Sequence, residues 1–308
     1  MSKNNFDVAD LGKNYDPRLE EFRTKGEQSK MPKASSDVTK TILLIVDMQR
    51  DFVHADGALS VPGALDDTSR LIDWIYKNAK DVTTICASLD THKELQIFHP
   101  PWWKNIETGK HPDPFTSITF ADIKNGKWQA LVDPIWSVKY IEKLELNAKK
   151  NLMIWPLHCI EGTDGQKLVP ALHEAIEFHA GARNTNPIFI EKGTVPQVEH
   201  YGIFASEVFF PKNSKASGLN VDTLDMIANY DRIYVAGEAK SHCVLETMKQ
   251  MLAYFSNQSE VIEKIHFLMD CTSSVAHPAI DFETLAMAEL KDMESKGVVM
   301  VNSTEPIS

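Results

Sequence analysis

The chain has 308 residues, of which 43% are hydrophobic, so it is long enough for one large core or two smaller ones. Its formal net charge of -11 argues against sequence-independent binding of DNA or RNA, because phosphate binding needs a positive surface. Its four cysteines lie far apart, which favours neither a zinc ribbon nor a disulfide framework and fits a reducing cytosol.

Residues 1–38 are polar and show no sustained hydrophobic period, so we expect an N-terminal extension that is flexible or lies on the surface and takes no part in chemistry. The extension has no basic start followed by an apolar stretch. No run of about 18 apolar residues occurs along the sequence. We therefore predict a cytoplasmic protein that neither enters a membrane nor is exported.

From residue 39 onward, short apolar segments alternate with segments of helical periodicity. Strands are predicted at 41–47, 82–90, 187–193, 232–238, 264–270 and 297–303, and helices at 64–80, 165–180, 244–256 and 279–295. This alternation is typical of a parallel sheet covered on both faces by helices. We therefore predict one doubly wound α/β domain over residues 39–308, with a mainly parallel six-stranded sheet.

One segment, residues 100–149, does not follow this alternation. It contains Trp102, Trp103, Trp128 and Trp136 together with several prolines and a charged helix-like stretch. An aromatic content this high argues against disorder, and a loop this long usually has a function or a structure of its own. We interpret it as a large insertion that forms either a lid or a contact in a homo-oligomer.

Chemically versatile side chains follow several predicted strands: Asp47, Asp90 with His92, Lys192 and Cys243. Parallel strands bring their carboxyl ends to one edge of a sheet, where ligands bind. A helix N-terminus and an ammonium favour a thiolate, and a carboxylate can take the thiol proton. Each residue alone is more often structural, but together they indicate a nucleophilic site, with backbone N–H groups before Cys243 available to an oxyanion.

The segments "LLIVDMQRDFV", "SLDTH", "WPLHCIEGTDG", "EKGT" and "VAGEAKSHCV" resemble, in this order, the signature segments of the isochorismatase-like cysteine hydrolases, and among them the nicotinamidase/pyrazinamidase branch. The resemblance covers about residues 40–303 apart from the insertion. It implies a catalytic triad of Asp47, Lys192 and Cys243. It also implies a cis peptide between Glu238 and Ala239, with the N–H groups of Ala239 and Cys243 forming an oxyanion hole.

Members of this branch hold a divalent metal through an Asp-x-His pair and the histidine of a W-P-x-H-C segment. The resemblance therefore implies Asp90, His92 and His158 as metal ligands. Imidazole and carboxylate suit zinc, which we expect, and also iron or manganese. His99 and Glu199 are the candidates for a further ligand, and water would fill the remaining positions.

The resemblance also implies substrate-binding residues: Phe52 and Trp155 would enclose an aromatic ring, and Tyr201 would form another wall. Two departures accompany it, since Ser241 stands where the family usually has aspartate, and "YGIF" replaces its tyrosine-serine pair. The expected reaction is hydrolysis of nicotinamide or a close aromatic carboxamide to the acid and ammonia through a thioester.

Three alternatives remain open at this stage. The chain could hydrolyse another small amide, such as a carbamoyl, ureido or maleamate-like compound. It could instead be a binding protein on the same fold that has lost turnover, since a fold does not fix a function. Finally, Cys243 could have a redox role with Cys159 or Cys271 as its partner.

Overall fold

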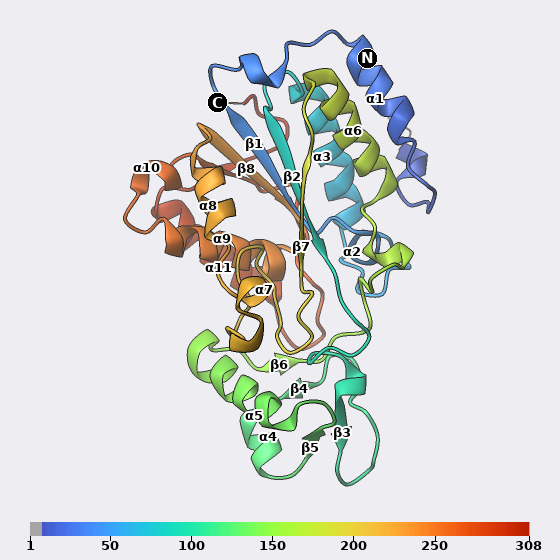
Figure 1. Cartoon of the computed structure of the whole chain (residues 1–308), viewed down its shortest axis with the longest axis vertical. Coiled ribbons are helices and arrows are strands. Elements are labelled where there is room, and N and C mark those ends of the chain that lie inside the picture. Colours follow the sequence, from blue (N-terminus) through green and yellow to red (C-terminus); the bar gives the residue numbers. More distant parts are fainter. Residues whose placement is uncertain (1–7, 308) are drawn as a thin grey trace.

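The computed structural model, which describes residues 8–307, has a six-stranded sheet at its centre (Figure 1). All neighbouring strands pair in parallel, so the predicted doubly wound α/β fold is confirmed. The strand order across the sheet is β10 (Val299–Val301), β9 (Ile265–Leu268), β8 (Arg232–Gly237), β1 (Thr41–Val46), β2 (Thr84–Asp90) and β7 (Ile188–Lys192).

This strand order places a switch point between β1 and β8. The chain winds from β1 through β2 to β7 on one side, and then from β8 through β9 to β10 on the other. At such a point the loops after two neighbouring strands diverge and leave a crevice that binds ligands. Asp47 follows β1 directly and Cys243 follows β8, so both candidate residues lie at this crevice.

The sheet is buried on both faces, which explains why β1 is an unbroken apolar run. Leu43 and Ile45 belong to one core, whereas Ile42 and Leu44 belong to the other. The first core lies under α3 (Ala64–Asn78) and α6 (Pro170–Arg183), and the second under α8 (Val221–Ala228), α9 (Leu245–Tyr254) and α11 (Phe282–Ser295). Shorter helices are α2 (Arg50–Val53), α7 (Ser214–Ser217) and α10 (Ser259–Ile262). None of the helices within residues 8–307 has both the length and the apolar character needed to cross a bilayer.

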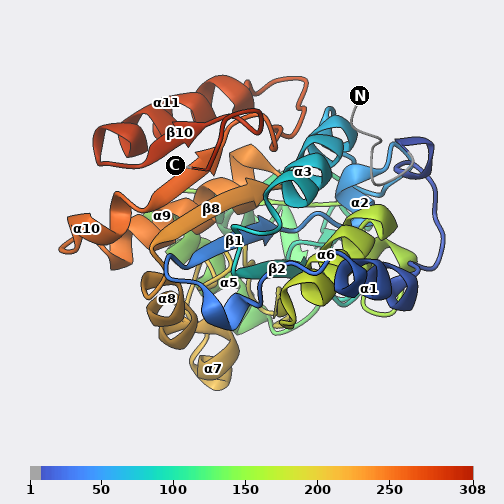
Figure 2. The ribbon, with the colours of Figure 1, turned by 90° about the horizontal axis from the view of Figure 1, so that it is seen from above.

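The N-terminal extension contains a helix, α1 (Leu19–Gln28), that packs along α6 (Figures 1 and 2). Phe22 and Gly26 are buried in this contact, and a Cβ on Gly26 would lie 2.1 Å from the carbonyl oxygen of Phe178. The Arg18 guanidinium forms an ion pair with Glu174 at 2.7 Å. Of the two expectations, a flexible extension or one that lies on the surface, the structure supports the second for the described residues. The extension packs there as a helix, which its polar composition did not predict.

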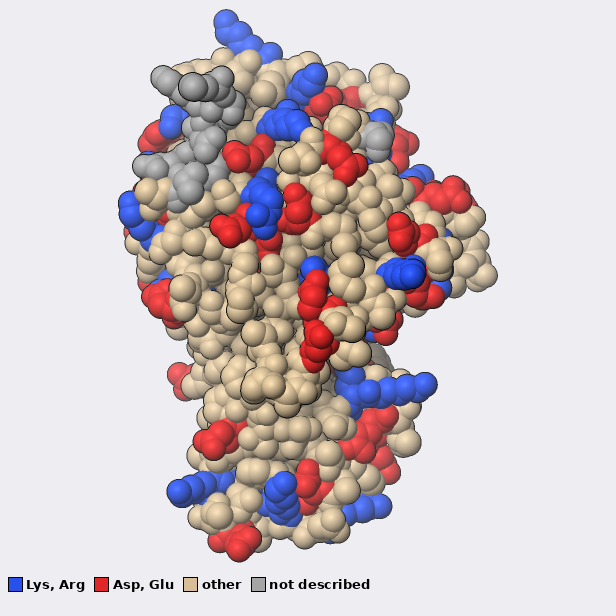
Figure 3. Space-filling view, turned by 180° about the vertical axis from the view of Figure 1, so that it is seen from behind, with Lys and Arg blue, Asp and Glu red and all other residues tan. Residues whose placement is uncertain are grey.

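The insertion forms a small lobe beyond the end at which β2 leaves the sheet, at the bottom of Figure 1. Its elements are β3 (Trp103–Asn105) paired with β5 (Trp128–Ala130), β4 (Ser117–Ile118), α4 (Phe120–Lys124) and α5 (Pro134–Lys143). Strand β4 pairs with β6 (Leu152–Met153), which follows the insertion directly. The surface narrows between this lobe and the main body, and the face seen in Figure 3 is largely uncharged there.

Three of the four tryptophans of the insertion are buried. Trp102, Trp103 and Trp128 belong to the apolar core, so their side chains are not available as a subunit surface. Trp136 is half-buried, and its indole N–H donates to the carbonyl oxygen of Gln197 at 2.8 Å. The lobe is thus attached to the loop that follows β7.

Candidate active site

The three residues expected to form the triad converge around the ammonium of Lys192. Its Nζ lies 2.8 Å from Asp47 Oδ2, 3.0 Å from Asp90 Oδ1 and 3.7 Å from Cys243 Sγ. A carboxylate oxygen of Asp47 lies within 4.8 Å of the same sulfur. Strand ends at β1, β2 and β7 supply the two carboxylates and the lysine, and the turn after β8 supplies the thiol.

Hydrogen bonds fix the Asp47 side chain in this cluster. Asp47 has a φ of 46°, so the chain turns sharply where β1 ends. The Ser88 hydroxyl donates to Asp47 Oδ1 at 2.6 Å and accepts the Asp47 N–H at 3.0 Å. This leaves Oδ2 directed at Lys192, so the carboxylate is oriented before any substrate arrives.

Burial controls the proton affinities in the cluster. It raises the pKa of the Cys243 thiol well above its ordinary value, while Lys192 opposes the shift. Burial also raises the pKa of Asp47, again against Lys192. Burial would lower the pKa of Lys192, but Asp47 and Asp90 raise it well above its usual range. The site therefore combines a cation with a carboxyl group and a thiol whose proton affinities are both raised, so a proton can pass between them while Lys192 stabilises whichever of the two is ionised.

The turn before Cys243 provides backbone donors. The peptide bond between Glu238 and Ala239 is cis, as expected, and Gly237 has a φ of 130°. A Cβ on Gly237 would lie 2.1 Å from the carbonyl oxygen of Val46, so only glycine fits this approach to β1. Within the described residues, the Ala239 N–H has no hydrogen-bond acceptor. That N–H remains available to an oxyanion.

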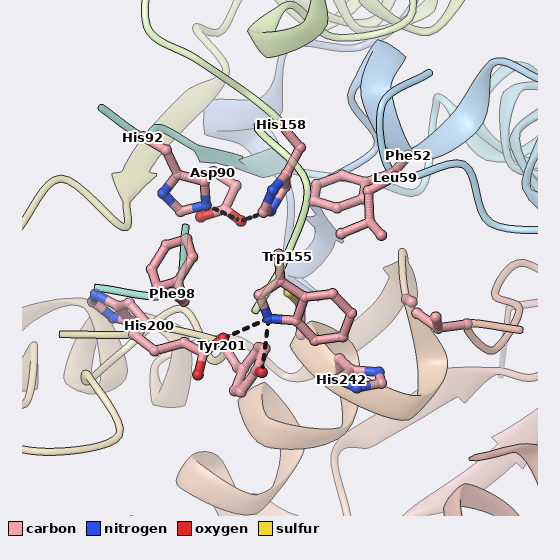
Figure 4. Close-up of a pocket in the computed structure, with 14 residues that line it drawn as sticks. Phe52, Leu59, Asp90, His92, Phe98, Trp155, His158, His200, Tyr201 and His242 are labelled. Atoms are coloured by element: carbon pink, nitrogen blue, oxygen red, sulfur yellow. Dashed lines mark hydrogen bonds and ion pairs between the residues drawn. The ribbon is translucent and has the colours of Figure 1, made fainter. Parts of the chain in front are cut away.

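Asp90, His92 and His158 form a second cluster, in which each offers a ligand atom within 4.8 Å of the others. Asp90 Oδ2 lies 2.9 Å from His92 Nε2 and 3.9 Å from His158 Nε2 (Figure 4). Burial would raise the pKa of Asp90, but His92 and Lys192 outweigh it and hold that pKa well below its usual range. Burial lowers the pKa of His158 to about 4. The cluster thus contains a carboxylate and, at His158, a neutral imidazole.

The hydrogen bonds of the two imidazoles fit a bound cation. His158 Nδ1 lies 2.8 Å from the carbonyl oxygen of Pro156, and His92 Nδ1 lies 3.2 Å from that of Gly193. Because a carbonyl oxygen only accepts, His158 Nδ1 carries the proton and His158 Nε2 turns a lone pair toward Asp90. His92 Nδ1 also lies 3.2 Å from the side-chain nitrogen of Gln96, and His92 Nε2 lies 2.9 Å from Asp90 Oδ2. The carboxylate and the two Nε2 atoms thus gather at one point, where a divalent metal could replace a proton between them. Carboxylate and imidazole are ligands typical of zinc, iron and manganese.

The two candidates for a further ligand lie in different places. His99 packs beside the metal cluster, with its ring centroid 5.9 Å from that of His92 and 5.6 Å from that of His158. Its Nδ1 faces the carbonyl oxygen of Lys93 at 3.1 Å, while its buried Nε2 has no hydrogen-bond partner. Glu199 instead accepts a hydrogen bond from the Trp155 indole at 2.7 Å. His99 therefore fits a ligand role better than Glu199 does.

Between the two clusters lies a small cavity, which we call the inner cavity. Phe52, Trp155 and Tyr201, the expected substrate-binding residues, all line it, as do Cys243 and Ala239. The Trp155 indole donates to both Glu199 and the Tyr201 hydroxyl, the latter at 3.1 Å (Figure 4). These bonds hold two aromatic walls in a fixed relation to the nucleophile.

Several further residues that line the inner cavity were not among those expected from the sequence. Phe98 packs edge-on against His92 with ring centroids 4.9 Å apart, and His242 packs edge-on against Trp155 at 5.4 Å. His200 lies in the same wall, and its buried Nε2 has no hydrogen-bond partner among the described residues. Each of the three adjoins a residue that the motifs singled out, and this adjacency is the signal by which they could have been found.

The insertion reaches the cavity wall from outside. Phe115 packs edge-on against Trp155 with ring centroids 5.8 Å apart. The Tyr140 hydroxyl accepts the backbone N–H of Glu199 at 3.0 Å. The lobe thus supports the outer side of the Trp155 wall.

Two curated nicotinamidases are similar in sequence to this chain. No protein-family model matches the sequence. The nicotinamidase of Saccharomyces cerevisiae is 23% identical over 206 residues, which are 67% of this chain and 78% of that protein. The nicotinamidase of Escherichia coli is 26% identical over 216 residues, which are 68% of this chain and 75% of that protein.

Solved structures show the same fold. The yeast nicotinamidase bound to the inhibitor nicotinaldehyde aligns with a TM-score of 0.55 at 18% identity, covering 85% of this chain and 99% of that one. A nicotinamidase/pyrazinamidase of Acinetobacter baumanii aligns with a TM-score of 0.54 at 19% identity, covering 87% of this chain and 98% of that one. The chain therefore has the isochorismatase-like hydrolase fold and resembles the nicotinamidase branch of that superfamily.

Proposed function

We propose that the chain is a nicotinamidase-like amidohydrolase that uses Cys243 to hydrolyse nicotinamide or a close aromatic carboxamide to the acid and ammonia. One observation carries the proposal: Lys192 Nζ contacts Asp47, Asp90 and Cys243 in a buried cluster at the wall of an aromatic cavity. The similarity to two curated nicotinamidases supports the same chemistry.

The first half of the reaction forms a thioester. Asp47 takes the proton of Cys243, and the thiolate attacks the amide carbon. The negative charge that develops on the amide oxygen is stabilised by the N–H of Ala239 and by that of Cys243, which lies in the first turn of a helix and so lacks an intrahelical acceptor. Asp47 then returns its proton to the leaving nitrogen, and ammonia departs as the carbon–nitrogen bond breaks.

The second half restores the enzyme. Asp47, again ionised, takes a proton from a water molecule, whose oxygen attacks the thioester carbon. The carbon–sulfur bond breaks, the carboxylic acid leaves, and the thiolate regains its proton from Asp47. Lys192 remains charged throughout and offsets the negative charge, which is held first by Asp47 and then by sulfur.

Asp90, His92 and His158 would hold a divalent metal beside this cluster, with His99 as a further candidate. The ion would act as a Lewis acid, either toward a ring nitrogen of the bound substrate or toward a water molecule. Lys192 connects the two clusters because it also contacts Asp90 at 3.0 Å. In this proposal the ring of the substrate would lie between Phe52 and Trp155, which both line the inner cavity.

Two of the alternatives remain to be separated from this proposal. A different small amide would use the same triad without needing the aromatic walls. A redox role would require a disulfide partner for Cys243, and all four cysteines are buried and free in the structure. No observation favours either alternative over nicotinamide hydrolysis.

The deciding experiment measures ammonia release from nicotinamide, pyrazinamide and several non-aromatic amides, before and after chelation of metal. We expect the two aromatic amides to be hydrolysed and the metal-free protein to be slower. Hydrolysis confined to the non-aromatic amides would reject the proposed substrate. Full activity after complete removal of metal would remove the ion from the mechanism.

A further inference from the structure

A second and larger pocket adjoins the inner cavity; we call it the outer pocket. It lies between α9, α11 and the β4–β6 pair at the base of the insertion. The centres of water molecules can occupy about 710 Å³ of the outer pocket but only about 30 Å³ of the inner cavity. Trp155, Tyr201 and His242 line both spaces. These three side chains form a shared wall between the nucleophile and the outer pocket.

His242 occupies a fixed position in this shared wall. Its ring packs edge-on against Trp155 at 5.4 Å and against Phe282 of α11 at 4.7 Å. The Ser241 hydroxyl accepts the Val275 N–H at 3.1 Å and lies 2.8 Å from His242 Nδ1. Ser241 thus orients His242 along the boundary of the two pockets.

The outer pocket offers apolar surface and no unpaired cation among the described residues. Leu285 is 57% exposed on α11 and lines the pocket together with Phe282. Lys150 is paired with Glu207 at 2.7 Å and with Glu246 at 3.0 Å. Lys249 on α9, the other lysine of the pocket, lies 3.4 Å from both Glu246 and Glu289. The pocket therefore has no unpaired positive charge among the described residues to bind a phosphate group, and its exposed apolar side chains favour an apolar ligand group.

We propose that the outer pocket binds an apolar, uncharged substituent of a carboxamide whose amide group occupies the inner cavity. This inference rests on the proposed amidohydrolase function and narrows its substrate class. The inner cavity and the outer pocket meet at the shared wall, because Trp155, Tyr201 and His242 line both spaces. A substituent on the ring then continues past Trp155 and His242 into the outer pocket, where it covers Leu285.

The test compares two variants of α11 on two substrates. Leu285→Glu places a charge in the outer pocket, and Met287→Glu is the matched control, because Met287 is exposed on the same helix but lines a different pocket. The measured quantity is kcat/KM for nicotinamides carrying a phenyl or propyl group on the ring, divided by kcat/KM for nicotinamide. We expect this ratio to be about tenfold lower in Leu285→Glu than in Met287→Glu, the discrimination typical of a small apolar contact.

The possible outcomes separate this inference from the proposed function. The outer-pocket inference alone is overturned if nicotinamide is hydrolysed but the substituted compounds are not. It is also overturned if the kcat/KM ratio is equal in the two variants. Hydrolysis of the substituted compounds without nicotinamide overturns the proposed substrate alone. Preference for a nicotinamide that carries a phosphorylated ribose contradicts the charge argument. Calorimetry with Cys243→Ala protein measures binding without turnover, and failure to bind the phenyl compound also overturns the inference.

Discussion

The two sides of the inner cavity differ in how their charges are balanced. On the nucleophile side, the Lys192 ammonium lies 2.8 Å from the carboxylate of Asp47 and 3.7 Å from the sulfur of Cys243. On the metal side, Asp90 Oδ2 faces the Nε2 atoms of His92 and His158. The chain supplies its own cation to the first side, whereas in our proposal the second side would take its cation from solution.

Replacing the nucleophile has the largest expected effect and tests whether the nucleophile side does the chemistry. Cys243→Ala should lower kcat by roughly 10⁴-fold or more while leaving the free energy of unfolding within about 1 kcal/mol of its original value. Cys271→Ala is the control, because Cys271 is also buried at the end of a strand but does not line the inner cavity. Equal losses in both variants would indicate that a cysteine pair, and not a single thiol, is required.

Removing the internal cation tests the balance on the nucleophile side directly. Lys192→Met should lower kcat by about a hundredfold or more and destabilise the fold by about 3–5 kcal/mol, because it leaves Asp47 and Asp90 buried without their partner. Asp47→Asn should cost a similar factor in kcat but less stability, since Lys192 keeps Asp90. Urea unfolding and steady-state kinetics measure both. Equal destabilisation by the two variants would contradict the assigned charge balance.

Removing the metal tests the other side. Chelation should lower the melting temperature, because the ion would bind only the folded state. At a free metal concentration of about 100 times its Kd, such an ion adds about 2.7 kcal/mol to the free energy of unfolding. His158→Ala should reduce bound metal and lower kcat/KM by roughly 10- to 100-fold. His173→Ala is the control, because His173 lies on α6 against Phe189. Equal metal content in the two variants, measured by mass spectrometry, would exclude His158 as a ligand.

The sequence predicted the sheet and the nucleophile side because both depend on local patterns. Apolar runs of five to seven residues marked the strands, and the residues at their carboxyl ends meet wherever strands are parallel. Asp47 and Lys192 end such runs, so their proximity followed from topology. Asp90 and His92 followed for the same reason.

The features that the sequence did not predict depend on how long loops and surface segments pack. Glu199 lies in the loop after β7, and its bond to Trp155 depends on the path of that loop. The helix α1 rests on close approach at Gly26, which a hydrophobic period does not reveal. The insertion buries three tryptophans in an apolar core that is continuous with that of the main body, which composition alone cannot establish.

A pH series tests whether Glu199 belongs to the wall and not to the metal side. Burial, aided by the nearby Glu207, raises the pKa of Glu199 from 4.5 to about 8. Between pH 4.5 and 8, Glu199 is protonated in the folded state and ionised in the unfolded state. The contribution of this proton to the free energy of unfolding is therefore complete below pH 4.5 and is lost as pH rises to 8. Glutamine mimics the protonated side chain, so the free energy of unfolding of the original protein should fall relative to that of Glu199→Gln as pH rises over that range in urea unfolding. A difference that is constant with pH would show that Glu199 is ionised in the fold.

The smallest expected effect concerns the support that the insertion gives to the cavity wall. Phe115 is 42% exposed and touches Trp155 edge-on, so Phe115→Ala removes one aromatic contact worth about 0.5–1.5 kcal/mol. Because Trp155 contacts the substrate and not the reacting bond in our proposal, the loss should raise KM for nicotinamide by roughly two- to tenfold and leave kcat nearly constant. Ile106→Ala, at another exposed apolar side chain of the same lobe, should change neither constant. A fall in kcat with KM unchanged would instead indicate that the insertion acts on the nucleophile side, and the two sides would then be coupled through the wall.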